Sequence, residues 1–210
     1  MSALSAVPDL DAARRPLRVE AGRPPIDLAA AELAVSDLLK ALGQDAYSTH
    51  LLATPRRVAA SFAEMLEPRA FDLTTFENDG SYDGLILAKD LPVRSMCQHH
   101  MLPFVGTARV AYLPGERIVG LSKLGRIVEH FAKNFQVQER LTAQIAAWIE
   151  ENLSPQGVAV VLEAEHLCMS LRGVQAHGSK TITSTFKGVL RTDDRARDEF
   201  FRLAGMGLGR

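Results

Sequence analysis

The chain has 210 residues, of which 47% are hydrophobic, so it can bury a core as one large domain or as a domain with an appended helical segment. Its 24 basic and 25 acidic residues nearly cancel, which argues against a broad basic surface for nucleic acid or for an anionic membrane. No apolar run approaches the roughly 20 residues that span a bilayer, and the opening "MSALSAVPDLDAARRPLRVE" lacks the apolar core of a signal peptide. We therefore expect a globular, cytoplasmic protein that binds neither nucleic acid nor a membrane.

The first part of the chain predicts an arm followed by helices. Residues 1–25 are rich in Ala, Arg, Pro and Asp without a clear period, which indicates a flexible arm. In "IDLAAAELAVSDLLKALG" apolar residues recur at helical spacing up to Gly43, a residue suited to end a helix. A second helix is expected in "TPRRVAASFAEML", with Thr54 as its N-cap and Pro55 in its first turn. Residues 26–80 are therefore predicted to form a helical part.

Residues 81–210 change to strands and paired helices. The runs "LILAKDLPVRSMC" and "TARVAYLP" predict two strands, separated by Pro103 and Gly106 as turn residues. Two helices follow, one capped by Ser122 and one over about residues 137–153. The runs "VAVVLEAEHLCMSLRG" and "KTITSTFKGVL" predict a long strand and its partner, and "DDRARDEFFRLAG" predicts a short C-terminal helix. The order β-β-α-α-β-β after a helical part predicts an α+β fold with an antiparallel sheet.

Both cysteines and three of the six histidines fall in two short segments. "SMCQHHMLPF" carries Cys97, His99 and His100, and "EAEHLCMSLRG" carries His166 and Cys168. A single buried cysteine or histidine is most often a structural residue. The clustering of both residue types favours a metal site instead.

A zinc site with one open position would be formed by two thiolates and one imidazole, from Cys97, His100 and Cys168. Because residues three apart point to opposite faces of a straight strand, joint ligation requires the chain to curl at Gln98 and His99. A zinc-bound water can have a pKa near 7, and His99 and His166 would then be free for proton transfer. A closed structural zinc site with either histidine as fourth ligand stays open, since spacing does not separate the two kinds of site.

If "VAVVLEAEHLCMSLRG" forms one long strand, its alternating side chains bring several candidate site residues to one face. Side chains on a strand alternate between the two faces of a sheet. One face would begin with apolar residues and end with His166, Cys168, Ser170 and Arg172. Cys168 could then hold a metal while His166 reaches a molecule bound beside it.

Two other segments carry candidate binding residues. In "GLSKLGRIV", Ser122 at a helix start with Lys123 and Arg126 brings N–H groups, the helix dipole and two cations together, which predicts an anion site. The alternative is a capped helix with solvated basic residues. In "QVQERLTAQI", Gln138 and Glu139 suit an ordinary helix start, although a carboxylate can also pair with the two N–H groups of a guanine edge.

Five segments in order resemble the GTP cyclohydrolase I family: "SMCQHHMLPFVG", "GLSKLGRIVEHFA", "QVQERLTAQI", "EAEHLCMSLRGV" and "SKTITSTFKGVLR". "TPRRVA" upstream and "RDEFFRL" downstream extend the resemblance from about residue 26 to the C-terminus. Members of the family convert GTP to 7,8-dihydroneopterin triphosphate and formate, the first step of pterin and tetrahydrofolate biosynthesis. The resemblance implies that this chain catalyses the same reaction.

The resemblance also implies a role for each candidate residue. One zinc ion per subunit would be held by Cys97, His100 and Cys168, and the hydroxide on it would attack C8 of guanine. His166 would donate a proton to N7, and His99 would act as a second acid-base residue. Gln138 and Glu139 would lie in the purine pocket, with Glu139 on the guanine edge. The triphosphate and ribose would be bound by Ser122, Lys123, Arg126 and Arg172.

The family's architecture supplies an expectation for the whole molecule. Members have the tunnelling fold (T-fold), an antiparallel sheet with two helices on one side, and their subunits pool these sheets into a barrel. Barrel closure removes exposed strand edges, which gives a physical reason for assembly. The resemblance therefore implies a homodecamer of two stacked pentamers, with active sites between subunits and GTP as the substrate.

One residue departs from the family's pattern, because the family motif reads Cys-Glu-His-His and this chain has Gln98 at the second position. A missing carboxylate beside a ligand could change proton traffic or zinc affinity, or ease repulsion with the triphosphate. Two alternatives stay open. The same reaction could serve a deazapurine or other secondary pathway, or the protein could be a non-catalytic, zinc-stabilised nucleotide-binding paralogue, against which the presence of both His99 and His166 argues.

Overall fold

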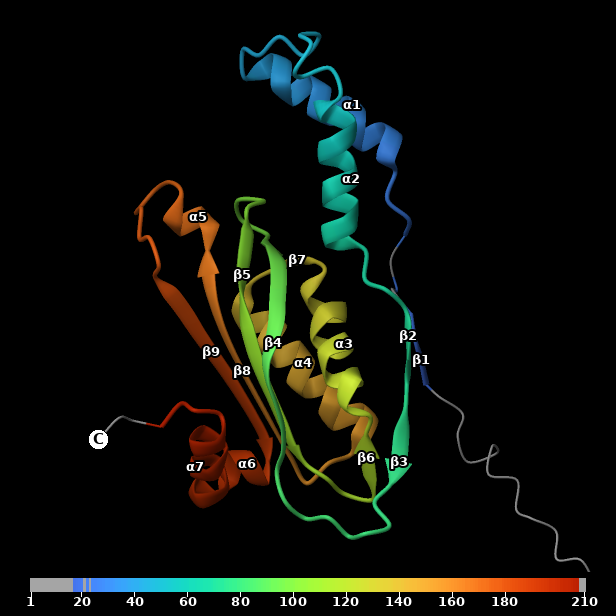
Figure 1. The fold of residues 1–210 in the computed structure, drawn as a ribbon, viewed down its shortest axis with the longest axis vertical. Helices are drawn as coiled ribbons and strands as arrows, with labels where there is room; N and C mark the ends of the chain where they lie inside the picture. The colour runs from blue at the N-terminus through green and yellow to red at the C-terminus, as the bar shows by residue number, and fades with distance from the viewer. Residues whose placement is uncertain (1–16, 21, 23, 208–210) are drawn as a thin grey trace, which may run out of the picture.

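The computed structural model describes residues 17–20, 22 and 24–207 (Figure 1). Most of the expected arm, residues 1–25, therefore lies outside the described residues. Its described part includes β1 (Leu17–Val19), which pairs antiparallel with β2 (Phe71–Leu73). Strands of three residues are too short to show an alternating pattern in a sequence, so β1 was not expected.

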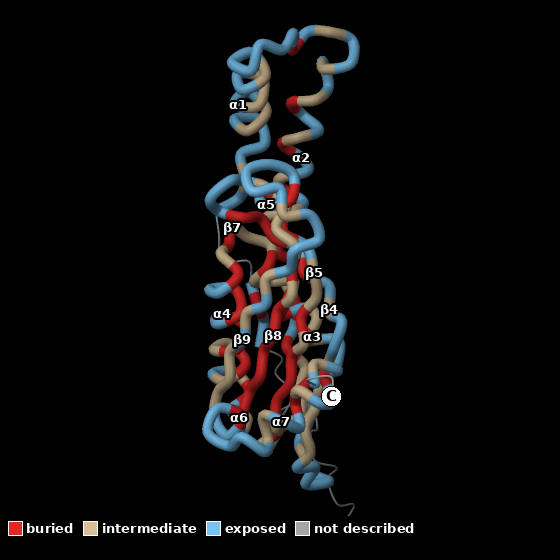
Figure 2. Tube along the Cα trace, turned by 90° about the vertical axis from the view of Figure 1, so that its left-hand side faces the viewer, coloured by how far each residue is buried: buried red, intermediate tan, exposed pale blue. Residues whose placement is uncertain are grey.

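Two helices form a hairpin that extends beyond the end of the main sheet (Figure 1). α1 (Leu28–Ala41) begins where the Asp27 carboxylate accepts from the Ala30 N–H at 2.9 Å, and α2 (Thr54–Leu66) follows it. Both predicted helices are confirmed. Thr54 is the first helical residue rather than the N-cap, which is Ala53 without a side-chain hydrogen bond. No residue of α1 is fully buried; one face is partly buried and the rest is exposed (Figure 2).

The centre of the molecule is a five-stranded sheet of order β7-β4-β5-β8-β9. Its strands are β4 (Ile86–Cys97), β5 (Pro103–Leu113), β7 (Phe135–Gln136), β8 (Gly157–His166) and β9 (Lys180–Gly188). All neighbours are antiparallel except β7, which pairs parallel with β4. The predicted strand pairs and the α+β class are confirmed.

Pro103 and Gly106 were expected to be turn residues, but both lie in β5. Pro103 is the first residue of the strand, a position where its missing N–H is tolerated. Gly106 is needed because the backbone of β8 comes very close: an added β-carbon would lie 1.9 Å from the carbonyl oxygen of Glu163. The glycine therefore marks a close approach of two strands and not a turn.

Helices cover the two faces of the sheet unequally (Figure 1). α3 (Leu121–Ala132) and α4 (Gln138–Leu153) pack on one face, and their buried residues form the main core with residues of β4, β5 and β8. The opposite face is covered near one end by α6 (Val189–Thr192) and by α7 (Asp194–Leu203), the predicted C-terminal helix. Ser122 was expected to cap α3, but the N-cap is Gly120 and Ser122 lies in the first turn.

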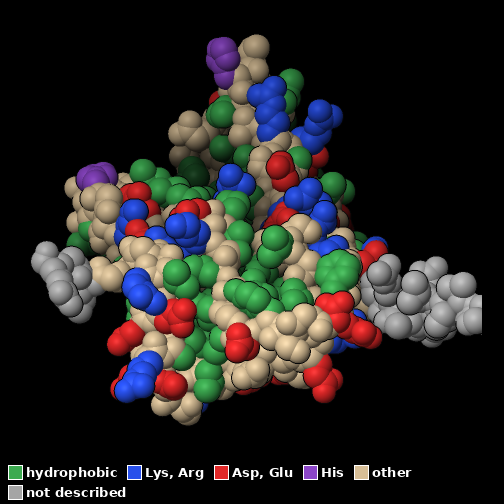
Figure 3. All heavy atoms as spheres, turned by 60° about the horizontal axis from the view of Figure 1, so that its bottom comes forward, with side chains coloured by type: hydrophobic (Ala, Val, Ile, Leu, Met, Phe, Trp, Pro, Cys, Tyr) green, Lys and Arg blue, Asp and Glu red, His purple; other side chains and the backbone are tan. Residues whose placement is uncertain are grey.

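The remaining described elements are short. β3 (Thr75–Glu77) pairs antiparallel with β6 (Arg117–Val119), and α5 (Leu167–Ser170) follows directly after β8. On the face that Figure 3 shows, Lys and Arg side chains are interspersed with Asp and Glu. Within the described part of the chain, no helix is both long and apolar enough to cross a membrane.

Candidate metal centre

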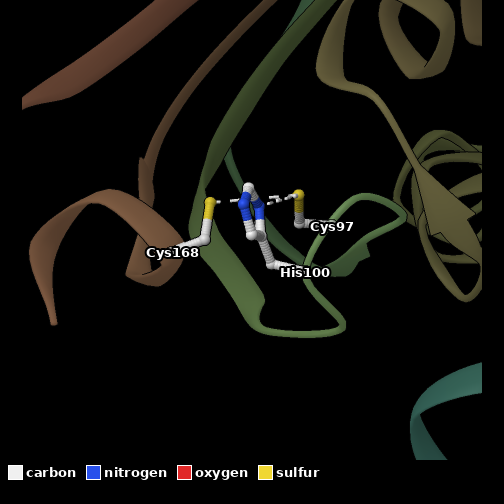
Figure 4. A group of neighbouring side chains, drawn as sticks. All are labelled: Cys97, His100 and Cys168. Atoms are coloured by element: carbon white, nitrogen blue, oxygen red, sulfur yellow. Dashed lines mark hydrogen bonds between the residues drawn. The ribbon is translucent and has the colours of Figure 1, made fainter. Parts of the chain in front are cut away.

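Three side chains from separate elements meet at one end of the sheet. The Cys97 and Cys168 sulfurs lie 3.9 Å apart, and the Cys97 sulfur lies 4.0 Å from His100 Nδ1. The ligand atoms of all three residues lie within 4.8 Å of one another, and the three side chains point toward a common centre (Figure 4). Both cysteines are buried, whereas His100 is exposed. The structure thus brings together all three of the predicted metal ligands.

Cys97 and His100 meet because the chain reverses between β4 and β5. The Met101 N–H donates to the Cys97 carbonyl, and the Cys97 N–H donates to the Leu102 carbonyl, both at 2.9 Å. Met101 adopts a positive φ of 54°, which completes this tight reversal. The predicted curl at Gln98 and His99 is therefore present, and it folds His100 back over the Cys97 thiol.

Cys168 reaches the same place in a way that the sequence pattern did not predict. The expected long strand ends at His166, and residues 167–170 form α5. His166 is thus the last strand residue on the core face, and one helical turn brings Cys168 beside Cys97. The alternation expected through Ser170 and Arg172 is wrong, because the Leu171 N–H donates to the Leu167 carbonyl at 3.0 Å instead of extending the ladder.

The chemistry of this group fits a thiophilic cation. Burial, and then the neighbouring Cys97 thiol, raise the pKa of the Cys168 thiol above its ordinary value. A cation that coordinates the sulfurs reverses this effect, because it stabilises the thiolates directly. Tetrahedral zinc with Zn–S bonds of about 2.3 Å places two sulfurs a little under 4 Å apart, close to the observed separation. The donor atoms are therefore already near the spacing that zinc requires.

His166 lies next to this group and is held by buried Gln138. Its Nε2 is 2.8 Å from Gln138 Oε1, and its ring stacks on Phe104 with centroids 4.6 Å apart. The Gln138 amide nitrogen donates to the carbonyls of Leu162 and Thr181, which can only accept. This fixes the amide orientation, so His166 Nε2 must be the donor to Oε1. Burial lowers the pKa of His166, and the charge of Glu139 opposes that effect.

The other candidate residues lie beside the metal group or close to His166. His99 lies in the same turn as the ligands, exposed, with Nδ1 4.0 Å from the Cys97 sulfur. Glu139 is exposed at the first turn of α4, close enough to act on the pKa of His166. Arg172 donates to the Cys168 carbonyl at 3.2 Å, so it also lies beside the metal group.

The predicted anion-binding residues lie farther away. Ser122, Lys123 and Arg126 occupy the first turns of α3, where Gly125 faces Leu91 of β4. Leu91 precedes Cys97 by six strand residues, or roughly 20 Å along β4 at ~3.3 Å per residue. These three residues therefore lie beside the middle of β4, whereas the metal group lies at its end.

Ser122 and Arg126 instead line a basic groove beside β4. One cavity of about 420 Å³ contains both residues, and a neighbouring cavity of about 580 Å³ extends to Pro103 and Leu167. The two cavities share three cations and one acid, Arg69, Arg94, Lys133 and Glu129. The Glu129 carboxylate is paired with Arg69 at 2.8 Å, so the groove keeps a positive excess. This groove could accept a polyanion.

Comparison with known proteins now decides the family. The family model described as GTP cyclohydrolase I matches residues 31–205. The chain belongs to the GTP cyclohydrolase I family. It is 48% identical to GTP cyclohydrolase 1 of Thermoanaerobacter pseudethanolicus over 182 residues, which is 85% of this chain and 97% of the relative. It is 47% identical to the Aquifex aeolicus protein of the same name over 178 residues, which is 85% of this chain and 97% of the relative, and 46% identical to the Sinorhizobium fredii protein over 180 residues, which is 82% and 87%.

Several residues of this family member were not identified by sequence reasoning. Arg140 donates to the side chain of Gln98, and Arg69, Arg94 and Lys133 line the groove with Arg126. None of them stands out in the sequence, because an isolated basic residue on a helix or strand is usually a solvated surface residue. Only the tertiary structure brings them next to residues that the motifs had already singled out.

Proposed function

We propose that this protein is a GTP cyclohydrolase I, which opens the imidazole ring of GTP at C8, releases formate and forms 7,8-dihydroneopterin triphosphate. The observation that carries the proposal is the group of Cys97, His100 and Cys168 beside His166, in a chain that belongs to this family. Its product would enter pterin and tetrahydrofolate biosynthesis. The two free thiols are consistent with the expected cytoplasmic location, where cysteines stay reduced.

Zinc, one ion per chain, is the metal proposed for Cys97, His100 and Cys168. Two sulfurs and one imidazole nitrogen are a zinc donor set, and three protein ligands leave a coordination position for solvent or substrate. When bound, the metal would supply Lewis acidity and lower the pKa of a coordinated water. His99 and His166 lie near the three ligands without belonging to them, which favours a catalytic zinc over a closed structural one.

His166 is the proposed proton donor to N7 of guanine, and Gln138 sets which ring nitrogen does this work. Because His166 Nε2 donates to Gln138 Oε1 at 2.8 Å, Nδ1 is left to take up and release the mobile proton. The lowered pKa of His166 makes the ring a ready proton donor once it is charged. Gln138 was predicted to lie in the purine pocket, but its contacts favour a role in orienting His166.

His99 and Glu139 complete the proposed chemistry at the guanine ring. His99 is exposed in the turn between the two ligands of the same segment, where a second acid-base group can reach the opened ring. Glu139 directly follows Gln138, and its carboxylate is exposed. Its two oxygens could accept from the two N–H groups of a guanine edge. Arg172 lies beside the metal group and would meet the ribose or the phosphates.

The triphosphate is proposed to bind Ser122, Lys123 and Arg126 of a neighbouring copy. The helix that carries these residues contacts β4 at Leu91, six strand residues before Cys97, so they are separated from the metal group along the strand of one chain. Sites between chains agree with the proposed tunnelling fold, barrel and decamer of two pentamers. Open sheet edges support this assembly: among residues 17–20, 22 and 24–207, β9 pairs only with β8, and β4 pairs on its outer side with β7 only at Met96 and Cys97.

The test is to incubate the zinc-loaded protein with GTP and to measure formate together with the fluorescence of the oxidised pterin product. Appearance of both would support ring opening and rearrangement, and would make Gln98 a tolerated substitution. Formate without pterin would mean that the reaction stops after ring opening. Neither product, despite a full zinc complement, would replace the proposal with a non-catalytic nucleotide-binding role.

A further inference from the structure

The turn that carries the metal ligands is tied to α4 by one arginine. Arg140 donates from one terminal nitrogen to Gln98 Oε1 and to the Phe135 carbonyl, each at 2.8 Å. Its Nε donates to Gln136 Oε1 at 2.9 Å. A single guanidinium thus connects three segments of the chain: the metal-ligand turn, β7 and the first turn of α4.

The far end of this connection is rigid. Gln136 is only 1% exposed, and its amide nitrogen donates to the Phe131 carbonyl at 3.0 Å and to Gln144 Oε1 at 2.9 Å. These bonds fix which way the amide points, so its oxygen is held toward Arg140. The Gln98 N–H also donates to the Gln136 carbonyl at 3.0 Å. Gln98 is therefore fixed at both its backbone and its side chain.

The residues at the two ends explain why this connection matters for the site. Gln98 stands between Cys97 and His99, and Arg140 directly follows Gln138 and Glu139. Moving Arg140 would let the turn with His99 and His100 shift relative to the helix end that holds His166 and faces the purine. A misplacement of about 1 Å at a reacting group can cost on the order of 100-fold in rate.

The charge of Arg140 distinguishes this connection from a surface ion pair. Among the described residues its side chain contacts three neutral oxygens and forms no ion pair within 4.0 Å. A charged donor on a neutral acceptor makes a stronger hydrogen bond than two neutral groups do. Gln98 therefore keeps the link without neutralising the guanidinium, which leaves a positive charge next to the metal ligands.

We propose that Arg140 is a positioning residue that holds the metal-ligand turn against the start of α4 through Gln98. The role in turnover rests on the proposed function. The role in holding the ligands does not require GTP, because it concerns the metal alone. A loosened turn would carry His100 away from the two sulfurs and make the metal easier to remove.

The test compares full-length Arg140→Ala, Gln98→Ala and the double variant, with Arg195→Ala as the matched control. Arg195 is an exposed arginine of α7, and Figure 1 shows α7 at the opposite end of the sheet from α5, the helix that contains Cys168. Zinc transfer to a chromogenic chelator, and kcat and KM for GTP, are measured for each protein. Each single variant should lose zinc about 10-fold faster and lower kcat more than it raises KM. The double variant should be no worse than the more impaired single variant, because both break one link.

Additive losses in the double variant would overturn the proposal, as would zinc transfer at the wild-type rate in Arg140→Ala. Gln98→Glu gives an independent arm: it keeps an acceptor for Arg140, so it should retain zinc at least as well as wild type. Zinc loss as fast as in Gln98→Ala would overturn the proposal too. If Arg140→Ala fails to fold, Arg140→Lys and the two Gln98 variants carry the same comparison. Absence of formate from the wild-type protein would refute the proposed function, and the zinc measurements would still test the link.

Discussion

Gln138 is only 2% exposed, and both ends of its amide are bonded inside the protein. Its amide nitrogen donates to the carbonyls of Leu162 and Thr181 and to the hydroxyl of Thr183. Its amide oxygen accepts from His166. Replacing it with alanine leaves two buried carbonyls with fewer donors, which costs roughly 1–3 kcal/mol of unfolding free energy. It also frees the His166 ring, so kcat for formate release should fall at least ~10-fold.

The Gln138→Ala variant is checked by urea unfolding and by steady-state kinetics with GTP. Gln138→Glu serves as its partner, since a carboxylate keeps an acceptor for His166 but has no N–H for the two carbonyls. Recovery of kcat in Gln138→Glu without recovery of stability would separate the two roles. Equal kcat for wild type and Gln138→Ala would contradict the role in orienting His166.

His166 and Cys97 allow chemistry and metal binding to be separated. His166→Ala should abolish formate release, a loss of about 100-fold or more, and keep zinc, because it is not among the three ligand positions. Cys97→Ser should lose zinc, because it removes a thiolate from the donor set. Formate is measured by an enzymatic assay and zinc by atomic absorption, with His50→Ala as the control at an exposed histidine. A His166→Ala protein with undiminished turnover would refute the proposed mechanism.

At the residue scale, the sequence predicts side chains that cluster locally and misses those that meet through folding. Cys97, His99 and His100 lie within four positions, so their joint role was visible without a structure. Arg140 is 42 positions from Gln98 and sits on a helix surface, where nothing in the sequence marks it. Gln138 was identified as a site residue, but the orientation of its side-chain amide was not predicted. That orientation depends on which carbonyls of β8 and β9 lie next to it.

At the scale of elements, β5 and β8 lie so close together at Gly106 that no side chain fits there. An added methyl group would lie 1.9 Å from the Glu163 carbonyl and 2.6 Å from the Ala164 α-carbon, both backbone atoms that cannot swing away. Gly106→Ala should therefore destabilise the protein by about 3 kcal/mol or more, measured by urea unfolding. Gly80→Ala is the control, because open space surrounds that glycine. A Gly106→Ala protein as stable as wild type would mean that the two strands separate easily.

The pairing of β8 with β9 should depend on pH through Glu163. The hydrogen bond from Lys180 at 2.8 Å lowers the pKa of Glu163 below its ordinary value, and Arg109 adds a weaker contribution. The folded-state pKa is depressed, so the stabilisation is present above the unfolded-state pKa and is lost as pH falls through the folded-state pKa. Because Lys180 is 60% exposed, solvent screens the pair and the effect is at most about 1 kcal/mol.

This prediction is measured by comparing Glu163→Gln with wild type in urea unfolding at pH 7 and at pH 3. The variant should be less stable at pH 7, and the difference should shrink toward pH 3, as protonation of Glu163 removes its charge. Glu116→Gln, at an exposed residue with no ion pair among the described residues, should show no such change. A difference that stays constant with pH would mean that Glu163 acts through packing and not through charge.

Elements were predicted well where one periodicity runs through them and poorly where they end. The β8 run reads as a strand because its buried residues are β-branched or aliphatic, yet nothing in "EAEHLCMSLRG" shows that the strand stops at His166. That end depends on tertiary contacts, including the Glu165 carboxylate, which accepts from Ser170 and from the Gly178 N–H at 3.2 Å and folds the following loop back. Pro103 and Gly106 were misassigned for the same reason, because their usual meaning as turn residues was overruled by the neighbouring strand.

At the scale of the whole molecule, the metal group and the proposed phosphate-binding residues lie at different places along β4. Cys97, His100 and Cys168 lie at one end of β4, while Ser122 and Arg126 lie beside its middle. In the part of the chain that the structure describes, two sheet edges are open to further strands, on β9 and on the outer side of β4. If copies associate through these edges, the metal group of one copy can approach the groove of the next.

Mixing two inactive variants tests this arrangement directly. Cys168→Ser lacks the metal group but has an intact groove, and Arg126→Ala has the metal group but a weakened groove. Co-expressed in equal amounts, they should recover about a quarter of wild-type formate release, since half the metal groups are intact and half of their neighbours supply Arg126. Each variant alone should stay near background, and native mass spectrometry should show mixed assemblies. Activity no higher than the average of the two variants alone, in assemblies that are demonstrably mixed, would mean that each chain supplies a whole site.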